Sequence, residues 1–413
     1  MWKGFQVNYA EAERWLFGRR RMGMKYGLDR MNSFMEDLGN PQQSFSTIHI
    51  VGTNGKGSTA AMLSGIAGEL GISWGRTTSP HLLHYRERIA ANSQWIPEES
   101  VARFVSENMH LMKKHTATFF EITTAMSAWY FAEKGVKWVA AEAGLGGRLD
   151  ATRTFAGKAT VFTGVQIEHS RILGNTRERI AAEKVAIAAP GTVLVTGKHT
   201  PGVEKVIEEA VRAGNLQRVS PLEVESSPLP GKHQKANGAL ALTAAVQMFG
   251  CTEEEVREAY AGTCNSLRWP GRLDYRAGSP SILFDVAHNP QSMEALANHV
   301  KGWKKPVPAV VGFLADKPWK KMVHILSGFA GPVFATTPVS ERRLEAEELA
   351  AFMKERGMEV YPVPDIMQAM ERCRAAAAGD RMIVTGSFYT VGDALDGAVS
   401  GGWVGGVPDS AGS

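Results

Sequence analysis

The chain has 413 residues, of which 44% are hydrophobic and 21% are charged, a balance that is ordinary for a soluble enzyme and excludes a disordered or collagen-like chain. Its formal net charge of +4 is too small over this length to indicate a nucleic-acid partner. Only three cysteines are present, Cys251, Cys264 and Cys373, which argues against a disulfide framework or a zinc cluster and favours a reducing, cytoplasmic setting.

The sequence offers no membrane-spanning segment. The N-terminal residues lack the apolar core and the small-residue cleavage site of a signal peptide. The longest uncharged, apolar-leaning stretch runs from Ala236 to Thr252, which is too short and too polar to cross a bilayer. We therefore expect no membrane partner and interpret this stretch as a buried helix.

From about residue 45 the sequence alternates short β-branched runs with longer helical patterns. The expected strands are Thr47–Val51, Trp138–Ala141, Ala159–Val165 and Thr192–Val195. A helix that carries an apolar stripe from Met62 to Leu70 is expected to stop at Gly71, and further helices are expected around Glu121–Glu133 and Arg177–Ala189. Such alternation predicts an α/β fold, in which a mostly parallel sheet is covered by helices on both faces.

A chain of this length exceeds one compact core, so we expect two domains. Pro270-Gly271 marks the boundary, because the alternation restarts beyond it. We predict a first α/β domain over residues 1–268, a linker over 269–274 and a smaller Rossmann-like α/β domain over 275–400. The glycine-rich residues 401–413 are predicted to form a disordered tail.

The elements expected in the second domain alternate regularly. The strands are Ile282–Phe284, Pro308–Val311, Val333–Ala335, Glu359–Tyr361 and Met382–Val384. The helices are Gln291–Val300, Trp319–Leu326, Leu344–Lys354 and Ile366–Ala376.

A glycine-rich segment, Gly52-Thr53-Asn54-Gly55-Lys56-Gly57-Ser58-Thr59, follows a predicted strand and precedes a predicted helix. Glycines let backbone N–H groups face a polyphosphate, and a helix N-terminus adds partial positive charge. Lys56 is placed to reach the terminal phosphates of ATP, and Ser58 to bind magnesium. The first glycine gap is shorter than in the usual phosphate loop, and an ordinary turn with an incidental lysine is the alternative.

This loop resembles the ATP loop of the Mur ligase superfamily, specifically of its folylpolyglutamate synthase/dihydrofolate synthase branch. The resemblance continues along nearly the whole chain. The segments that carry it are Thr78-Ser79-Pro80-His81-Leu82, Glu87-Arg88-Ile89, Glu142-Ala143-Gly144-Leu145-Gly146-Gly147-Arg148-Leu149-Asp150-Ala151-Thr152, Ile180-Ala181-Ala182-Glu183-Lys184, Gly231-Lys232-His233-Gln234-Lys235-Ala236-Asn237, Trp269-Pro270-Gly271-Arg272-Leu273 and Asp285-Val286-Ala287-His288-Asn289-Pro290.

Several residues are candidate ligands of magnesium besides Ser58. Glu142 ends a predicted strand at the carboxyl edge of the sheet, where it could hold the ion or merely cap the next turn. A lone histidine such as His169 is more often structural, and Mg²⁺ prefers oxygen. The resemblance implies that Ser79, Glu142 and His169 are metal ligands. The family usually has Asp before this histidine, where the chain has Glu168.

Lys184 lies in a predicted helix, where a lysine usually extends to solvent. The resemblance implies instead that Lys184 is carbamylated by CO₂ and supports a second magnesium ion. Such a reaction needs a partly buried lysine with a lowered pKa, because only the neutral amine attacks CO₂.

Residues at or beyond the predicted linker complete the expected ATP site. Arg272, Asp285 and His288 could be solvated linker residues. The resemblance implies instead that Arg272 contacts phosphate, that Asp285 contacts the nucleoside and that His288 lies near the transferred phosphate. It also implies that Asn237 contacts adenine. We therefore expect the second domain to close the site.

The resemblance also implies the reaction. ATP phosphorylates the carboxylate of a folate or of dihydropteroate, and the amine of L-glutamate then displaces phosphate. A carboxylate is a poor electrophile, so the acyl phosphate supplies a leaving group, and the excluded water cannot hydrolyse it. We expect Lys56, Lys184 and His288 to be the catalytic residues of a monomer with two Mg²⁺ sites and no redox cofactor.

Only 51 residues precede Gly52, too few for the nucleotide-sugar domain of the muramyl-peptide ligases, so we expect the ATPase domain to bind the pterin. By resemblance the candidates are Leu28-Asp29-Arg30-Met31, Thr118-Phe119-Phe120-Glu121 and Leu149-Asp150-Ala151. Phe120 could stack on a flat pterin, although burial in the core explains the Phe119-Phe120 pair equally well.

Two other functions stay open. A related ligase of the same superfamily could act on a different carboxylate, such as an amino-acid or peptide precursor. A non-catalytic module would bind ATP without turnover, but the complete set of loop, metal and lysine positions disfavours it. Nothing in the second domain identifies the glutamate-binding residues by chemistry.

Overall fold

The computed structural model describes residues 7–22, 27–303 and 306–406, and its two sheets confirm the predicted α/β fold. The first sheet has eight strands in the order β4-β3-β2-β5-β1-β6-β7-β8. The strands are β1 Ser46–Val51, β2 Trp74–Thr77, β3 Ile89–Ala91, β4 Gln94–Trp95, β5 Trp138–Glu142, β6 Gly157–Phe162, β7 Val193–Thr196 and β8 Gln217–Val219. All pair in parallel except β3 and β4, which are antiparallel at one edge.

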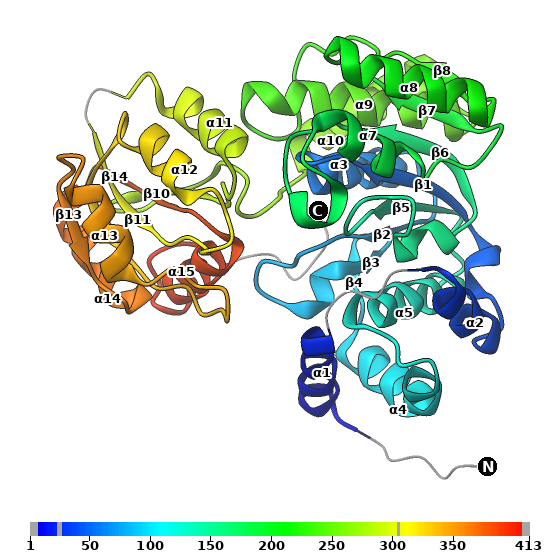
Figure 1. Cartoon of the computed structure of the whole chain (residues 1–413), viewed down its shortest axis with the longest axis horizontal. Coiled ribbons are helices and arrows are strands. Elements are labelled where there is room, and N and C mark those ends of the chain that lie inside the picture. Colours follow the sequence, from blue (N-terminus) through cyan, green and yellow to red (C-terminus); the bar gives the residue numbers. More distant parts are fainter. Residues whose placement is uncertain (1–6, 23–26, 304–305, 407–413) are drawn as a thin grey trace.

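Alternate residues of the central strands pack against different helices, as the two-residue period of a strand requires. In β5, Val139 and Ala141 join the cluster that contains α5, whereas Ala140 joins the cluster that contains α3 and α9. Figure 1 shows α9 and α10 above this sheet and α4 and α5 below it. The helices on the two faces are α1 Tyr9–Gly18, α2 Asp29–Asp37, α3 Lys56–Glu69, α4 Glu98–Lys114, α5 Phe119–Glu133, α6 Ser170–Leu173, α7 Arg177–Val185, α8 Pro201–Gly214, α9 Lys232–Met248 and α10 Glu253–Ser266.

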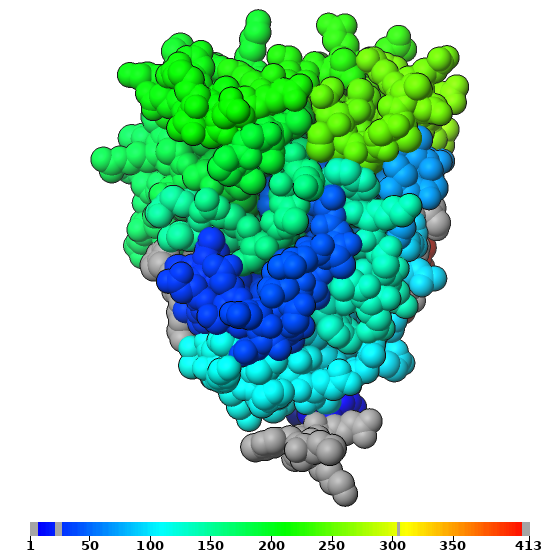
Figure 2. Space-filling view, turned by 90° about the vertical axis from the view of Figure 1, so that its right-hand side faces the viewer, coloured from blue at the N-terminus to red at the C-terminus, as the bar shows by residue number. Residues whose placement is uncertain are grey.

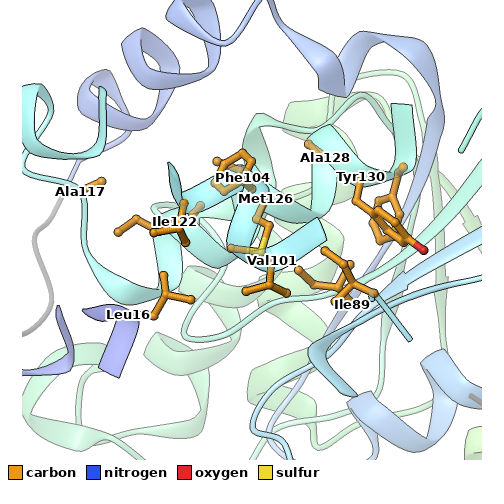
Figure 3. Close-up of a cluster of buried hydrophobic side chains, with 14 of the residues drawn as sticks. Leu16, Ile89, Val101, Phe104, Ala117, Ile122, Met126, Ala128 and Tyr130 are labelled. Atoms are coloured by element: carbon orange, nitrogen blue, oxygen red, sulfur yellow. The ribbon is translucent and has the colours of Figure 1, made fainter. Parts of the chain in front are cut away.

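The lower cluster is built by the helices that precede β5. Figure 3 shows Leu16 of α1, Val101 and Phe104 of α4, and Ile122 and Met126 of α5 gathered in one apolar core. In Figure 2 the blue segment that includes α2 covers part of the outer surface beside cyan α4, with which it is in contact. This packing fixes α5, whose first turn faces the cavity described below.

The second sheet has six strands in the order β13-β12-β11-β14-β10-β9, and only β9 is antiparallel. Its strands are β9 Asp274–Arg276, β10 Ser281–Asp285, β11 Val307–Val311, β12 Ala330–Ala335, β13 Val360–Pro362 and β14 Arg381–Thr385. Its helices are α11 Pro290–Val300, α12 Trp319–Leu326, α13 Ala346–Lys354, α14 Ile366–Ala377 and α15 Phe388–Ser400. The chain passes between the two sheets from Ser266, the end of α10, to Asp274, the start of β9.

Some predicted boundaries differ from the structure. Strand β6 ends at Phe162, because the Thr163 hydroxyl turns back to the carbonyl oxygen of Asn54 and Gly164 adopts a φ of +118°. Helix α7 ends at Val185, ahead of Pro190, which cannot continue a helix. The predicted helix from Ala236 begins earlier, at Lys232.

Residues 401–406 also differ from the predicted disordered tail, because the structure places them. Val404 is buried, and the guanidinium of Arg374 lies 4.9 Å from the ring centroid of Trp403. Apolar contacts thus hold this segment against the second domain. The rest of the predicted tail, 407–413, lies outside the described residues. Among the described helices, none combines the length and the hydropathy needed to cross a membrane.

Candidate active site

A cavity of about 870 Å³ lies where the carboxyl ends of both sheets face each other, and residues of both domains line it. From the first domain come the glycine-rich loop after β1, the segment after β2, the start of α5 and the segments after β5 and β6. The second domain contributes the loops after β10, β11 and β14. Open α/β sheets bind ligands at this edge, so the cavity is the candidate active site.

The glycine-rich loop turns sharply between β1 and α3. Gly55 has a φ of +85°, which favours glycine, and the loop is tied to the segment after β6 by a 2.9 Å bond from Thr53 N to Gly164 O. The Lys56 ammonium donates to Thr53 O at 3.2 Å and lies 3.7 Å from Glu142 Oε1. Residues 53–58 line the cavity, whereas the predicted ligand Thr59 is fully buried behind them.

Helix α9 packs its polar face onto this loop. A Cβ atom added to Gly55 would lie 2.3 Å from Asn237 Oδ1, so the Asn237 side chain occupies the space beside the loop. Asn237 donates to Gln234 Oε1 at 2.8 Å, and Gln234 Nε2 donates to Ser58 Oγ at 3.3 Å. Sequence reasoning missed Gln234, although its spacing from Asn237 places both on one helix face.

Glu142 and Ser79 meet beside Lys56. Glu142 ends β5 and is buried, and its Oε2 accepts a 3.0 Å bond from Ser79 N. Burial raises the pKa of Glu142, while Lys56, the Ser79 N–H and Arg272 lower it. A pair of hydroxyls, from Ser58 and Ser79, and one carboxylate therefore face the same cavity.

This donor set fits magnesium, which takes oxygen ligands and keeps several from water or phosphate. Within the described ranges, no three His, Cys, Asp or Glu side chains form a metal-binding group. A magnesium ion held by Glu142, Ser58 and Ser79 would therefore draw its remaining ligands from the nucleotide and water.

His169 reaches the cavity from a strained backbone. It precedes α6 with a φ of +52°, and its Nε2 lies 3.8 Å from Glu168 Oε1. Glu168 pairs across the cavity with Lys317 of the second domain at 2.5 Å. Burial would raise the pKa of Glu168, but the charge and hydrogen bond of Lys317, together with the charges of His288 and His169, outweigh it, and the pKa falls to about 2. Sequence reasoning did not identify Lys317.

Lys184 of α7 lies behind the glycine-rich loop and does not line the cavity. It is buried, and its Nζ donates to Gly52 O at 2.7 Å. Burial, and next the charge of Lys56, lower the pKa of Lys184 to about 7. The neutral amine is therefore available near neutral pH.

The second domain supplies the other wall through Arg272, Asp285 and His288. The Arg272 guanidinium lies 5.0 Å from the ring centroid of Phe388. Asp285 accepts bonds from Leu273 N at 2.9 Å and Ala287 N at 3.0 Å, and burial raises its pKa to about 6.

His288 is held in one tautomer. Its Nδ1 lies 2.9 Å from Val286 O, which can only accept, so Nδ1 carries the proton and Nε2 is left as an acceptor. Burial lowers the pKa of His288 to about 4, which keeps the ring neutral at neutral pH.

Direct hydrogen bonds join the phosphate loop to the second domain. Asn289 Nδ2 donates to Asn54 Oδ1 at 2.8 Å, and Asn54 Nδ2 donates to Gln291 Oε1 at 2.6 Å. Asn289 also caps α11 through Ser292 N. The sequence signal for Asn289 was its place before Pro290, typical of a helix start, but nothing local indicated Asn54 as its partner.

The predicted pterin residues divide into two sets. Leu28, Met31, Thr118–Glu121 and Leu149–Ala151 line the cavity, but Asp29 and Arg30 do not. Arg30 instead pairs with Glu121 at 2.6 Å, which ties α2 to the start of α5. Phe120 packs over Gly144, where an added Cβ would lie 2.5 Å from its ring.

Asp150 holds the turn after β5 from inside the cavity wall. Its carboxylate accepts from Leu145 N at 2.9 Å, Thr152 N at 3.0 Å and Thr152 Oγ1 at 2.6 Å. Burial raises the pKa of Asp150, and these donors lower it. Through these three hydrogen bonds Asp150 stabilises the turn after β5, in addition to lining the cavity.

Comparison with known proteins agrees with this geometry. Residues 271–388 match the family described as "Mur ligase, glutamate ligase domain". The chain is 31% identical to the dihydrofolate synthase/folylpolyglutamate synthase of Bacillus subtilis, over 93% of the chain and 98% of the relative. It is also 31% identical, over 94% of its length, to a probable bifunctional folylpolyglutamate synthase/dihydropteroate synthase of Haloferax volcanii, of which it spans 50%.

Solved structures show the same fold. The E. coli FolC complex with DHPP and ADP has a TM-score of 0.83 at 27% identity and covers 95% of this chain and 98% of its own. A bifunctional folylpolyglutamate synthase/dihydrofolate synthase with Mn, AMPPNP and L-glutamate bound has a TM-score of 0.84 at 25% identity, with 95% and 99% covered. The chain therefore belongs to the folylpolyglutamate synthase/dihydrofolate synthase family of the Mur ligases.

Proposed function

We propose that the chain is an ATP-dependent ligase that adds L-glutamate to the carboxylate of folates, and also to that of dihydropteroate. The observation that carries the proposal is one cavity that contains the phosphate loop, a buried carboxylate and an aromatic wall, with the second domain facing all three. Relatives named for both synthase activities, and structures that hold ADP with DHPP or AMPPNP with L-glutamate, support it.

The triphosphate of ATP would bind to the loop. The first residues of α3, from Lys56 to Ser58, line this site, and the helix N-terminus adds partial positive charge. Lys56, now 3.7 Å from Glu142, can turn its ammonium to the terminal phosphates. Ser58, Ser79 and Glu142 would hold magnesium, which when bound supplies positive charge to the phosphate oxygens.

The second domain would position the nucleotide and the amine. Arg272 lies at the cavity on the face of Phe388, where its guanidinium can meet phosphate oxygens. Neutral His288 offers Nε2 as an acceptor, so it can orient the amine of L-glutamate without adding a charge. We keep Asp285 as the nucleoside contact and Asn237 as the adenine contact.

Closure of the domains would protect the acyl phosphate. The bonds from Asn54 to Asn289 and Gln291, and the pair between Glu168 and Lys317, hold the two walls together around the cavity. Water excluded from that space cannot hydrolyse the activated carboxyl before the amine attacks.

We also propose that Lys184 is carbamylated, as the family resemblance implies, and that it then supports a second magnesium site. The lowered pKa of the buried Lys184 amine supports this, because the neutral form attacks CO₂. Lys184 lies behind Gly52, so its carbamate would act from the rear of the loop. His169 remains a proposed metal ligand together with Ser79 and Glu142.

We further propose that the enzyme acts as a cytoplasmic monomer without a redox cofactor, a nucleic acid or a membrane. One chain supplies both walls of the cavity, so the site needs no second copy. The three cysteines are free in the structure, in keeping with a reducing compartment.

The test is an assay with ATP, Mg²⁺, L-glutamate and either tetrahydrofolate or dihydropteroate, in which phosphate release and product mass are measured. We expect the mass of one added glutamate with each pterin, and no product from Lys56→Met. Failure to add glutamate to either pterin would reject the proposal. Turnover with another carboxylate would favour the related amide ligase, and ATP binding without turnover would favour a binding module.

A further inference from the structure

Arg76 has the largest side chain among the fully buried residues that the structure describes, with 1% of its surface exposed. It lies within β2, between β5 and β3, and no role in the proposed reaction has been given to it. Burying a guanidinium is costly unless its surroundings compensate the charge. A cation at this depth therefore needs an explanation.

The contacts of Arg76 lead to the segment between the domains. Its Nη1 donates to Ser64 Oγ of α3 at 3.0 Å. Its guanidinium carbon lies 4.5 Å from the ring centroid of Trp269 and 5.6 Å from that of Trp74. A desolvated cation on an indole face is among the stronger cation–π arrangements. Arg76 thus stabilises the position of Trp269, the first residue of the predicted linker.

Trp269 in turn lies against the phosphate loop. A Cβ atom added to Gly57 would be 3.8 Å from Trp269 Cζ2 and 3.3 Å from Glu142 Oε2. The indole therefore packs between Arg76 and the first turn of α3, next to the carboxylate proposed to hold magnesium.

Shortly after Trp269 the chain enters the cavity. Gly271 has a φ of +72°, and its carbonyl accepts from Val286 N at 2.9 Å, which fixes the turn. Arg272 follows directly and lines the cavity. A displaced indole would move the start of this turn and with it the guanidinium of Arg272.

We propose that Arg76 is a positioning residue for the nucleotide: it holds Trp269 against Gly57 and thereby sets where Arg272 enters the cavity. The inference rests on the proposed function in one respect, because it takes a nucleotide phosphate as the group that Arg272 meets. Arg76 itself does not line the cavity and acts through Trp269.

The experiment compares the affinity for AMPPNP with Mg²⁺, measured by calorimetry, in the full-length wild type and in Arg76→Met. Met keeps the volume and removes the cation, so we expect affinity to fall on the order of tenfold, the size of a desolvated cation–π contact. Arg76→Lys keeps the charge and should recover part of the loss. Arg103→Met is the matched control, because Arg103 lies 4.6 Å from the Trp129 centroid, away from the cavity.

Trp269→Leu should weaken AMPPNP binding to a similar extent, and adding Arg76→Met to it should cause little further loss. In the steady state, the KM for ATP should rise while the KM for L-glutamate stays unchanged, which a general loss of stability would not produce. If Arg76→Met does not fold, the Trp269→Leu variant decides the question.

Unchanged AMPPNP affinity in folded Arg76→Met, or in Trp269→Leu if the first does not fold, would overturn the inference alone. A wild type that binds no AMPPNP would overturn the proposed function and this inference with it. The two failures are therefore distinguishable.

Discussion

Gly55 illustrates at the scale of one residue how the loop depends on backbone freedom and on close contact together. It has a φ of +85°, and an added Cβ would lie 2.3 Å from Asn237 Oδ1. Gly71, just beyond α3, has a φ of +66° but no heavy atom within 4 Å of an added Cβ. A comparison of substitutions at Gly55 and Gly71 therefore distinguishes the effect of backbone strain alone from that of strain combined with a steric clash.

We expect Gly55→Ala to abolish measurable AMPPNP binding, because the new methyl group must push Asn237 and Gln234 away from the loop. Gly71→Ala should lower the free energy of unfolding by about 1 kcal/mol through strain and leave AMPPNP affinity unchanged. Calorimetric titration together with denaturant unfolding measures both. Equal nucleotide affinities in the two variants would contradict this view of the loop.

Lys184 carries a pH dependence with a defined sign. Burial lowers its pKa from 10.5 to about 7, so the unfolded chain binds more protons between these values. The cost of burying Lys184 is full below pH 7 and disappears as the pH rises toward 10.5. In CO₂-free buffer, wild type should therefore gain stability relative to Lys184→Met over this range, by up to about 1.4 kcal/mol per pH unit.

Denaturant unfolding at several pH values measures this difference. The matched control is Lys205→Met, because Lys205 is exposed on α8 and its substitution should leave the pH profile parallel to that of wild type. A flat difference between wild type and Lys184→Met would show that the amine is charged in the fold. Carbamylation would then lack its chemical basis.

At the scale of elements, two helices share one capping device but lie in different surroundings. In α5, Thr118 and Glu121 form a capping box in the cavity wall, and in α10, Thr252 and Glu255 form another on the surface. The motif is readable in the sequence, because Thr followed by Glu at the third helical position satisfies two backbone N–H groups. The sequence does not show that the capping box of α5 lies in the cavity wall.

We expect Thr118→Ala and Thr252→Ala each to lower the free energy of unfolding by about 1 kcal/mol, the usual cost of a lost cap. Only Thr118→Ala should also weaken dihydropteroate binding, because it leaves Glu121 in the cavity wall with Arg30, at 2.6 Å, but without the Thr118 hydroxyl. Thermal unfolding and fluorescence titration measure the two effects. Equal pterin affinities in both variants would show that the start of α5 does not contribute to pterin binding.

For the whole molecule, the pair between Glu168 and Lys317 bridges the two domains. Burial disfavours the Glu168 carboxylate, but Lys317, with smaller contributions from His288 and His169, lowers its pKa from 4.5 to about 2. Because the folded pKa lies below the unfolded value, the contribution is complete above pH 4.5 and is lost as the pH falls toward 2. The contact is therefore intact at neutral pH.

We expect Glu168→Gln to increase the radius of gyration of the nucleotide-free protein at neutral pH, because the neutral amide leaves Lys317 without its ion pair. Small-angle X-ray scattering measures the change. The control is Glu253→Gln, which breaks the exposed pair with Arg257 within one helix and should leave the radius unchanged. Identical radii in both variants would mean that the other interdomain bonds suffice for closure.

Local patterns in the sequence predicted the central strands, the phosphate loop and the family, because strand periodicity, glycines and turn residues act on neighbours in the chain. Residues 53–58, Glu142, Ser79 and His288 were predicted in this way or by resemblance, and they do line one cavity. Asp29, Arg30 and Thr59 were also predicted to be site residues, but they do not line the cavity. The short strands β2, β3, β4, β8 and β9 were not predicted.

Which side chains meet depends on the packing of the whole fold. Glu168 and Lys317 are separated by 149 positions, and Gln234 and Ser58 by 176, so no local pattern connects them. The same holds for Arg76, which the fold buries against Trp269. Such contacts depend on how sheets and helices pack, and packing is a property of the whole chain.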